Sequence, residues 1–559
     1  MRTHVNRTGP RPAPGEAAPL ASGQRSNPDL DLQRREAMTH PDAHLAGRSS
    51  THNDLVLNAL RAWSTRTAFI DGERRFTYGQ TSDLIARFMR VMTEYGVTRG
   101  SAVGILSPNR PEAWMVAMAA QFLGAHSVGM HARASVEDHV FECKDADVRL
   151  LVVDESYGSV ASDLSDAGVE RVLSIGPADF GHDLLALAEN AGSSELRLAA
   201  DVDENTVVEI LYTGGTTGRS KGVVQTQRAR AAITLASPLA YELPLHPVYV
   251  AAAPITHAAA HFLAPTLIRG GTVVTLNGFR PDEFIDAVNR HHGSLSFLVP
   301  TMIYRLLDAG LDLSMPSLER IVYGAAPMAP SRLIEGHERL GRVFTQIYGQ
   351  TESLALGTAL WSDEHDLDRP DRLLSCGRAV PGTWVELLDD EGLPVPAGNV
   401  GEICIRSAGV MLRYHNLPDL TAEALAGGWL HTGDMARRDD EGYITIVDRR
   451  KDFIISGGFN VYTREVEDVL TADPSVAYAA VIGVPDPDWG EAVKAVIVPA
   501  PGAEVDPERL IARVRSAKGA VHAPKSIDVV PELPLTPVGK TDKKALRATF
   551  WTDHERSVN

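Results

Sequence analysis

The sequence predicts an α/β fold, with a large N-terminal domain of layered α/β sheets, a following β section and a small C-terminal α+β domain. The chain has 559 residues, of which 44% are hydrophobic. This is more than one small core requires, so at least two domains are expected. Strand-like apolar runs alternate with helix-periodic segments through most of the chain, and repeated βα alternation implies layered sheets.

The alternation begins near residue 100. SAVGILSPN (101–109) and RLLVVDE (149–155) are strand-like, and EAWMVAMAAQFLGA (112–125) between them has helical periodicity. The same pattern returns in VYVAAAP (248–254), PDEFIDAVNRHH (281–292), LERIVYGAAP (318–327), PSRLIEGHERLG (330–341) and VFTQIYG (343–349). Several glycine-bearing loops directly follow strands, which is where open α/β sheets bind ligands.

The pattern of predicted secondary structure changes twice in the last third of the chain. Residues 380–447 contain short strands with Gly and Pro turns, a compact β section. After the charged run DRRKD (448–452), alternating helical and apolar segments predict a small α+β unit. We therefore expect an N-terminal domain over 46–450, a joint at DRRKD, and a C-terminal domain over 451–559.

The composition limits location and partners. Residues 1–45 are rich in Pro, Arg, Gly and Ser without the apolar core of a signal peptide, so we expect a disordered leader, with Met38 a candidate for the true start. A net charge of -18 argues against a general nucleic-acid binder. Three widely spaced cysteines fit neither a disulfide framework nor a zinc site with paired ligands, which favours a cytoplasmic protein. No membrane span is expected, because the apolar stretches are short or interrupted by polar residues.

A glycine- and threonine-rich loop follows one of the predicted strands. TGGTTGRSKG spans 213–222, directly after an apolar run. Small residues let backbone N–H groups approach an oxyanion, and hydroxyls and a lysine add contacts, so the loop predicts a phosphate site. It is not a P-loop, because Arg219 and Ser220 separate Gly218 from Lys221.

Six further short motifs follow the loop and are spread over most of the remaining chain. They are GAAP (324–327), YGQTES (348–353), HTGD (431–434), DRRKD (448–452), GGFNV (457–461) and LPLTPVGKTDKKALR (533–547). In this order they resemble the adenylate-forming superfamily of acyl-CoA synthetases, peptide-synthetase adenylation domains and luciferases. ISGGFNVYTREVE (455–467) and the end motif with Thr536, Gly539 and Lys540 are most similar to medium- and long-chain or aryl acyl-CoA synthetases.

The resemblance implies a two-step reaction that uses ATP, Mg²⁺ and coenzyme A. A carboxylate attacks the α-phosphate of ATP and expels pyrophosphate; the CoA thiol then attacks the acyl-adenylate and releases AMP. Two anions must meet in the first step, so cations and N–H donors are required. The implied phosphate-binding residues are Thr213, Gly214, Gly215, Thr216, Thr217, Gly218 and Lys221. Gly214 stands where the family has serine, and Ser220 where it has proline.

The resemblance assigns the rest of the nucleotide site as well. Glu352 and Thr217 would hold the magnesium ion. Asp434 would accept the ribose hydroxyls, with Arg449 beside them. The adenine would lie among Gly324, Ala325, Ala326, Tyr348, Gly349, Gln350 and Thr351.

Other implied residues are the catalytic lysine of the first step, the lining of the acyl and CoA pockets, and the hinge for the motion between steps. Lys540 would be the catalytic lysine that reaches the carboxylate and the α-phosphate, carried by a small mobile C-terminal domain. Lys451 would be the hinge of that domain. Gly458 would line the CoA tunnel, and His257 would close the acyl pocket. Lys543 and Lys544, close to Lys540 in the sequence, are interpreted as a solvated face. Three other histidines are interpreted as structural, namely His261, His291 and His292.

The expected activity is that of an ATP-dependent acyl-CoA synthetase for a hydrophobic acid, whether fatty, aryl or alicyclic, because the pocket segments are small and apolar. A stand-alone adenylating enzyme that loads a carrier-protein phosphopantetheine is the alternative. A non-catalytic nucleotide-binding relative is disfavoured by the presence of both Lys540 and Glu352. The sequence leaves the oligomeric state open, with a homodimer among the options.

Overall fold

The computed structural model describes residues 50–551, except 133, 193–194, 200, 214–219, 451, 457–458, 488 and 536–540. The proposed leader therefore lies outside the described residues. So do eight of the predicted site residues, namely Gly214, Gly215, Thr216, Thr217, Gly218, Lys451, Gly458 and Lys540.

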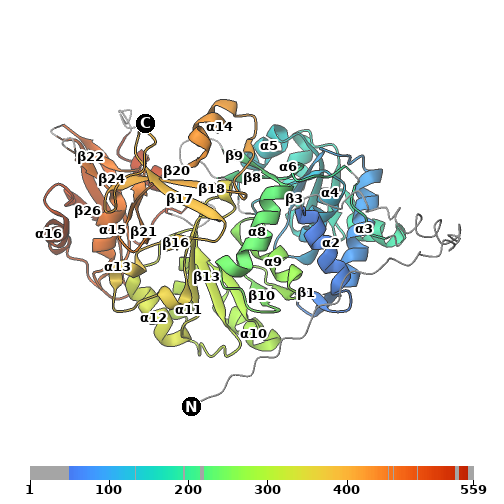
Figure 1. The fold of residues 1–559 in the computed structure, drawn as a ribbon, viewed down its shortest axis with the longest axis horizontal. Coiled ribbons are helices and arrows are strands. Elements are labelled where there is room, and N and C mark those ends of the chain that lie inside the picture. Colours follow the sequence, from blue (N-terminus) through green and yellow to red (C-terminus); the bar gives the residue numbers. More distant parts are fainter. Residues whose placement is uncertain are drawn as a thin grey trace, which may run out of the picture. The chain divides into compact units, whose positions relative to one another are not determined.

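Two large, mainly parallel sheets contain most of the strands between residues 50 and 415 (Figure 1). The nine-stranded sheet has the order β16 (Arg378–Ala379), β15 (Thr358–Leu360), β14 (Phe344–Tyr348), β13 (Arg320–Gly324), β12 (Leu295–Leu298), β10 (Val248–Ala251), β11 (Thr272–Thr275), β1 (Thr67–Asp71) and β2 (Arg74–Thr77). The eight-stranded sheet has the order β19 (Arg413–Tyr414), β9 (Lys221–Thr226), β8 (Val207–Thr213), β4 (His126–Met130), β3 (Ala102–Leu106), β5 (Val148–Asp154), β6 (Val172–Ile175) and β7 (His182–Asp183). Central strands such as β3 and β12 are buried along their whole length, as continuous apolar runs in parallel sheets require.

Helices connect these strands. They are α2 (His52–Ala62), α3 (Tyr78–Glu94), α4 (Pro111–Phe122), α5 (Val136–Asp145), α6 (Gly158–Asp166), α7 (Leu184–Asn190), α8 (Gln227–Ala240), α9 (Leu263–Ile268), α10 (Pro281–His291), α11 (Pro300–Asp308), α12 (Pro330–Leu340) and α13 (Pro370–Leu373). Helices α2, α3, α4, α8 and α9 share one apolar core with strands of both sheets. Local sequence fixes their starts, because Thr51 and Thr77 form capping boxes and α4, α10, α11 and α12 begin with proline.

Two smaller sheets follow in the chain. The predicted β section forms the antiparallel sheet β17 (Thr383–Leu388), β18 (Val400–Ser407), β20 (Leu430–Arg438) and β21 (Ile444–Arg449), with α14 (Pro418–Ala424) inserted. The last sheet contains β22 (Ile454–Ser456), β23 (Phe459–Val461), β24 (Val476–Asp486), β25 (Gly490–Pro499) and β26 (Ser526–Val529). Helices α15 (Thr463–Thr471), α16 (Pro507–Lys518) and α17 (Lys543–Ala548) accompany it. The predicted α/β class, the β section and the α+β character of the final segment are confirmed.

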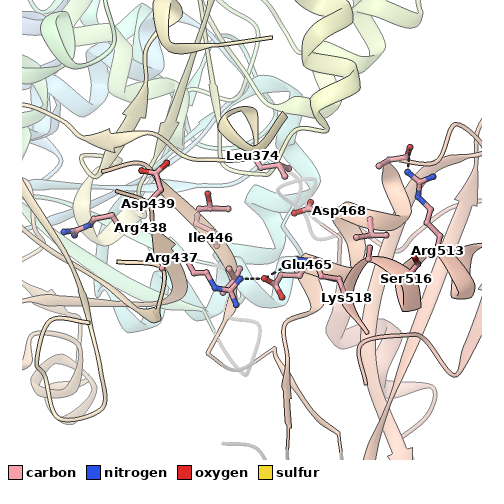
Figure 2. A pocket seen from close by; sticks show the side chains of 16 residues that line it. Leu374, Arg437, Arg438, Asp439, Ile446, Glu465, Asp468, Arg513, Ser516 and Lys518 are labelled. Atoms are coloured by element: carbon pink, nitrogen blue, oxygen red, sulfur yellow. Dashed lines mark hydrogen bonds and ion pairs between the residues drawn. The ribbon is translucent and has the colours of Figure 1, made fainter. Parts of the chain in front are cut away.

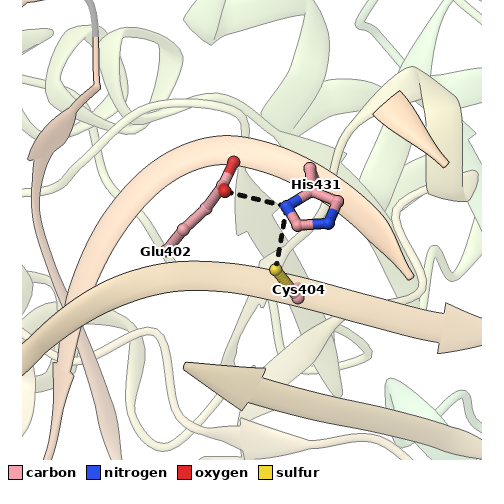
Figure 3. A group of neighbouring side chains, drawn as sticks. All are labelled: Glu402, Cys404 and His431. Carbon is pink, nitrogen blue, oxygen red and sulfur yellow. Dashed lines mark hydrogen bonds and ion pairs between the residues drawn. The ribbon is translucent and has the colours of Figure 1, made fainter. Parts of the chain in front are cut away.

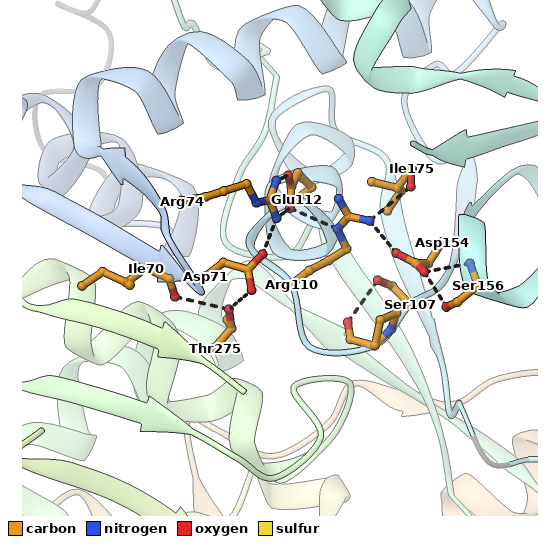
Figure 4. Close-up of polar contacts among 11 residues, drawn as sticks. Ile70, Asp71, Arg74, Ser107, Arg110, Glu112, Asp154, Ser156, Ile175 and Thr275 are labelled. Carbon is orange, nitrogen blue, oxygen red and sulfur yellow. Dashed lines mark hydrogen bonds and ion pairs between the residues drawn. The ribbon is translucent and has the colours of Figure 1, made fainter. Parts of the chain in front are cut away.

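A buried ion-pair network ties the edge of the nine-stranded sheet to the eight-stranded one (Figure 4). Glu112, in the first turn of α4, has a side chain only 2% exposed and is paired with Arg74 of β2 and Arg110. Arg110 also donates to Asp154 at the end of β5 (2.5 Å) and to the carbonyl of Ile175 at the end of β6 (3.1 Å). Burial alone would raise the pKa of Glu112, but hydrogen bonds from the two arginines lower it below its usual range.

Across the described part of the chain, no helix has the length and apolar character needed to cross a membrane.

Candidate functional site

The phosphate loop is suspended from an antiparallel strand pair. Strands β8 and β9 pair with Thr213 directly opposite Lys221, so the chain leaves and re-enters the sheet at facing residues. The Lys221 ammonium lies 5.4 Å from the ring centroid of Tyr414. Of the predicted phosphate-binding residues, the structure describes these two ends.

Tyr414 connects Lys221 to the predicted magnesium ligand. It lies on β19, which pairs with β9, and its hydroxyl donates to Glu352 Oε1 at 2.8 Å. Burial, followed by the Glu352 carboxylate, raises the pKa of Tyr414 well above its usual value, so this hydroxyl stays protonated as the donor. Glu352 is half-buried and offers carboxylate oxygens, the donors that Mg²⁺ prefers, so it fits a magnesium ligand.

The motif at 348–353 contacts the phosphate strand directly. The buried Gln225 of β9 donates its side-chain amide to the carbonyl of Thr351 at 2.8 Å. The Met411 amide donates to the carbonyl of Glu352 at 2.7 Å. Sequence reasoning identified neither Gln225 nor Tyr414, because both lie far along the chain from the residues that they contact.

The predicted adenine residues occupy strand ends where backbones approach closely. A Cβ on Gly324 would lie 2.4 Å from the carbonyl oxygen of Ile347, and one on Gly349 would lie 2.5 Å from Ala355 Cα. Packing between β13, β14 and the following turn therefore requires both glycines. Ala325 has φ +65° and Ala355 φ +62°. Left-handed alanines cost roughly 1–2 kcal/mol each, and such strain gathers at functional sites.

The predicted ribose residues meet around one carboxylate. Asp434 on β20 and Arg449 on β21 are cross-strand neighbours, with Oδ1 and Nε 3.3 Å apart. Asp434 Oδ2 accepts from the Tyr348 hydroxyl at 2.7 Å and the Gln350 amide at 2.8 Å. The attraction of Asp434 raises the pKa of Arg449, and burial raises that of Tyr348 well above its usual value. The structure thus joins the YGQTES and HTGD motifs.

His257 lies in a half-buried aromatic contact. Its ring meets that of His131 at 4.7 Å, nearly perpendicular, and its Nδ1 is 3.1 Å from Thr256 Oγ1. Burial, followed by His131, lowers the pKa of His257 to about 4, so the ring is neutral at pH 7. His261, interpreted as structural, is buried with its Nδ1 2.9 Å from Arg230 Nη1.

Lys543 corrects one expectation. The sequence placed it with Lys544 on a solvated face, but its ammonium is paired with Glu467 at 2.7 Å and donates to Thr463 Oγ1 at 2.7 Å. Its side chain is 19% exposed. Lys543 packs inward because it is the first residue of α17 and lies there beside Thr463, the first residue of α15.

A cavity of about 810 Å³ lies beside β20, β21, α15 and α16 (Figure 2). An ion pair between Arg437 and Glu465 crosses it, and Lys518 approaches Glu465 at 3.6 Å. Among the described residues, those predicted for nucleotide binding do not line this cavity. It is a cleft between the β section and the final α+β segment.

Comparison with known proteins identifies the family to which the chain is similar. The profile described as AMP-binding enzyme matches residues 57–415, and the profile described as AMP-binding enzyme C-terminal domain matches 465–540. A medium/long-chain fatty acid–CoA ligase of Mycobacterium tuberculosis is 39% identical over 564 residues, covering 97% of this chain and 98% of that protein. A feruloyl-CoA synthase of an Amycolatopsis species is 35% identical, covering 87% and 96% respectively.

A solved structure agrees. The amide bond synthetase McbA from Marinactinospora thermotolerans superposes with a TM-score of 0.83 at 35% identity, covering 90% of this chain and 100% of that one. The motifs, the fold and the two family profiles agree, and the chain belongs to the AMP-binding enzymes of the adenylate-forming superfamily.

Proposed function

We propose that the protein is an ATP-dependent acyl-CoA synthetase, which activates a hydrophobic carboxylic acid as an acyl-adenylate and transfers it to coenzyme A with release of AMP and pyrophosphate. The observation that carries the proposal is the convergence on the 348–352 segment. Lys221 and Glu352 meet there through Tyr414, and Asp434 meets it through Tyr348 and Gln350. The residues proposed to bind phosphate and those proposed to bind ribose are thus connected through one short motif.

The residues divide the first step between them. Lys221, Thr213 and the residues of the 214–218 loop bind the β- and γ-phosphates, while Asp434 accepts from the ribose hydroxyls with Arg449 alongside. Glu352 and Thr217 hold Mg²⁺, which neutralises phosphate charge when bound. Lys540 would act on both anions, the carboxylate and the α-phosphate, and would offset their repulsion while the new bond forms. Gly324, Ala325, Ala326, Gly349 and Thr351 line the adenine slot with Tyr348.

We further propose the division into domains, 46–450 and 451–559 after a leader at 1–45, with Lys451 as hinge. The 810 Å³ cleft between β20, β21, α15 and α16 supports this proposal, because in the described part of the chain the ion pair that crosses it is Arg437–Glu465. Partly exposed ion pairs contribute on the order of 1 kcal/mol, so they do not oppose rotation strongly. Gly458 then lines the CoA tunnel after the rotation.

The acid is hydrophobic in this proposal. The segment that leads to His257 is a run of small apolar residues, and Ala251, Ala252, Ala253 and Ala259 are buried there. His257 is neutral at pH 7 and adds no charge to attract a second carboxylate. The relatives that act on fatty and feruloyl groups support a fatty or aryl acid.

An amine acceptor is the second candidate. The likeness to an amide bond synthetase favours it, because the same adenylate can be attacked by an amine nitrogen instead of a thiol. A carrier-protein phosphopantetheine offers the same thiol chemistry as CoA on a larger acceptor. These acceptors differ in the second step alone.

The decisive experiment separates the two steps. A panel of medium-chain, long-chain, aryl and alicyclic acids is screened for pyrophosphate release, and products are identified with CoA, with a carrier protein or with an amine present. Acid-dependent pyrophosphate release and an acyl-CoA product are expected. Lys540→Ala is the matched control: it should lose adenylate formation yet still convert presynthesised acyl-adenylate to the thioester. Failure of every acid to release pyrophosphate contradicts the proposal, and an amide or carrier product in place of acyl-CoA selects the alternative.

A further inference from the structure

Three side chains with different ligand atoms converge beside the Asp434 turn (Figure 3). His431 Nδ1 lies 2.9 Å from Glu402 Oε2 and 3.5 Å from Cys404 Sγ. Glu402 and Cys404 are buried, while the His431 side chain is 25% exposed. The cluster is therefore closed on the protein side and open to solvent at the imidazole.

The strand pairing explains how these residues meet. Glu402 and Cys404 lie two positions apart on β18, so their side chains share one face of the sheet. Cys404 is the cross-strand partner of His431, whereas Glu402 is opposite Met435, so β20 contains extra residues between these two pairs. That bulge is the Thr-Gly-Asp turn, in which Gly433 has φ +71°. The sequence shows no paired-ligand spacing here, because the three ligands come from two strands.

Both contacts use the same imidazole nitrogen, which distinguishes this cluster from a proton relay. A Cys–His–carboxylate relay needs the thiol on one ring nitrogen and the carboxylate on the other. Here the thiol and the carboxylate both face Nδ1, and one proton on Nδ1 cannot be donated to both at once. Burial, followed by the Glu402 carboxylate, also raises the pKa of the Cys404 thiol to about 12, so it is not a nucleophile at neutral pH.

A cation at the centre would satisfy all three atoms together. With Zn–S near 2.3 Å and Zn–N near 2.0 Å, tetrahedral angles place sulfur and nitrogen about 3.5 Å apart. The measured separation of Cys404 Sγ and His431 Nδ1 is 3.5 Å. The nitrogen–oxygen edge needs to widen by only about 0.4 Å from 2.9 Å to reach the value of about 3.3 Å for zinc. Thiolate, imidazole and carboxylate together suit zinc rather than magnesium, which binds oxygen ligands.

Two neighbours of Glu402 determine how the ion would fit. The Gly433 amide donates to Oε1 at 2.8 Å, which orients the carboxylate and leaves Oε2 facing His431. Arg450 Nη1 lies 3.4 Å from Oε2, but this side chain is half-exposed and also binds Asp390 at 2.6 Å. The arginine can therefore retain Asp390 while moving away from the carboxylate.

We propose that Glu402, Cys404 and His431 form a Zn²⁺ site, with water in the fourth position. On binding, the Cys404 thiol releases its proton to solvent and the remaining imidazole proton resides on Nε2, with no change of oxidation state. The site is separate from the magnesium ligands assigned above. Because His431 and the Gly433 amide lie on the turn that carries Asp434, zinc holds this turn in a shifted position and lowers adenylate formation.

The binding experiment uses the full chain with Co²⁺ and Zn²⁺ alone and does not depend on the catalysed reaction. Co²⁺ should give a thiolate-to-cobalt charge-transfer band that one equivalent of Zn²⁺ abolishes. Cys404→Ala should remove the band, and His431→Gln should weaken Zn²⁺ binding at least about tenfold. Cys376→Ala, which removes a buried thiol outside the cluster, is the matched control and should leave the band intact. Absence of the band in the wild-type chain overturns the proposal whatever the variants do, as does a band that survives Cys404→Ala.

The functional arm measures zinc inhibition of acid-dependent pyrophosphate release at saturating Mg²⁺ and ATP. Each variant is normalised to its own rate without zinc. Zinc should inhibit the wild-type chain and the Cys376→Ala control at the concentration that displaces cobalt, and Cys404→Ala should need at least about tenfold more. Equal inhibition of all three proteins would place zinc at the magnesium site and overturn the coupling to Asp434.

Discussion

Glu112 and Asp434 are both nearly buried carboxylates, with side chains 2% and 7% exposed, yet their partners differ in kind. Glu112 is neutralised by two guanidinium groups, Arg74 and Arg110. Asp434 has two neutral donors and one arginine, Arg449, whose side chain is 47% exposed. Burial alone does not distinguish a structural carboxylate from a ligand-binding one.

The two carboxylates differ in the residues to which their hydrogen-bond networks connect them. From Glu112 the hydrogen bonds run through Arg110 to the ends of β5 and β6, so the network fixes strands of two sheets. From Asp434 they run to Tyr348 and Gln350, residues that precede the predicted magnesium ligand. We therefore expect loss of Glu112 to reduce stability, and loss of Asp434 to reduce nucleotide use.

The largest effect is expected for Glu112→Ala. Removing this carboxylate takes one partner from Arg110, whose side chain is 14% exposed and keeps Asp154, and one from the half-exposed Arg74, which keeps Asp71. The free energy of unfolding should therefore fall by about 3 kcal/mol, the lower end of the cost of breaking a buried ion pair. Urea unfolding of the full chain measures it. Activity per folded molecule should change little. A loss of activity without a loss of stability would reverse the assignment.

Asp434→Ala should give the opposite pattern. We expect kcat/KM for ATP to fall about 100-fold, equivalent to about 2.7 kcal/mol, because the acceptor for the ribose hydroxyls is lost. The half-exposed Arg449 can be hydrated by solvent, whereas Arg110 beside Glu112 is 14% exposed, so the free energy of unfolding should change less than in Glu112→Ala. Initial rates of pyrophosphate release over a range of ATP concentrations test this. A variant with unchanged ATP dependence would exclude Asp434 from the nucleotide site.

A third buried carboxylate extends the comparison to pH. Burial raises the pKa of Asp448 from 3.8 to about 6, although Lys543 and two backbone amides oppose the shift. The folded state then binds a proton more tightly than the unfolded state, so stability falls as pH rises from about 4 through 6.

Asp448→Asn should remove this dependence, by an amount on the order of 2 kcal/mol. The measurement is the difference in unfolding free energy between variant and wild type at several pH values. This difference should increase with pH through the window, whatever constant offset the lost hydrogen bonds to Thr463 and Arg449 introduce. Parallel curves would show that Asp448 has an ordinary pKa.

Tyr348→Phe should have the smallest effect. It removes one hydroxyl donor from Asp434 while Gln350 and Arg449 remain, so the expected cost in kcat/KM is about 1 kcal/mol, near fivefold. Gln350→Leu, which removes the second neutral donor, is the matched comparison. An effect of Tyr348→Phe as large as that of Asp434→Ala would mean that the hydroxyl itself contacts the nucleotide.

Much of the fold followed from local sequence. Strand-like apolar runs and helical periodicity predicted β3, α4, β5, β10, α10, β13, α12 and β14 near their observed positions. The motifs assigned Tyr348 and Gln350 to the adenine site and Asp434 and Arg449 to the ribose site, roles that stay predictions. The structure joins the four residues through contacts with Asp434.

What local sequence could not predict depends on distant pairing. Tyr414 reaches Glu352 only because β19 pairs with β9, and Cys404 reaches His431 only because β18 pairs with β20. Lys543 was assigned to a solvated face because a short charged run does not reveal which of its members packs inward. Thr213 and Lys221 belong to one predicted phosphate loop, but their position as direct cross-strand partners follows only from the pairing of β8 and β9.

That last pairing has a consequence for protein engineering. Because Thr213 and Lys221 face each other across two hydrogen-bonded strands, the connection between them is anchored at both ends by the sheet. We expect exchange of the intervening segment for one of equal length from another family member to keep the register of β8 and β9, because loop length is one determinant of hairpin register. The segment is therefore a natural cassette for grafting, in which turnover can be varied while the scaffold stays constant.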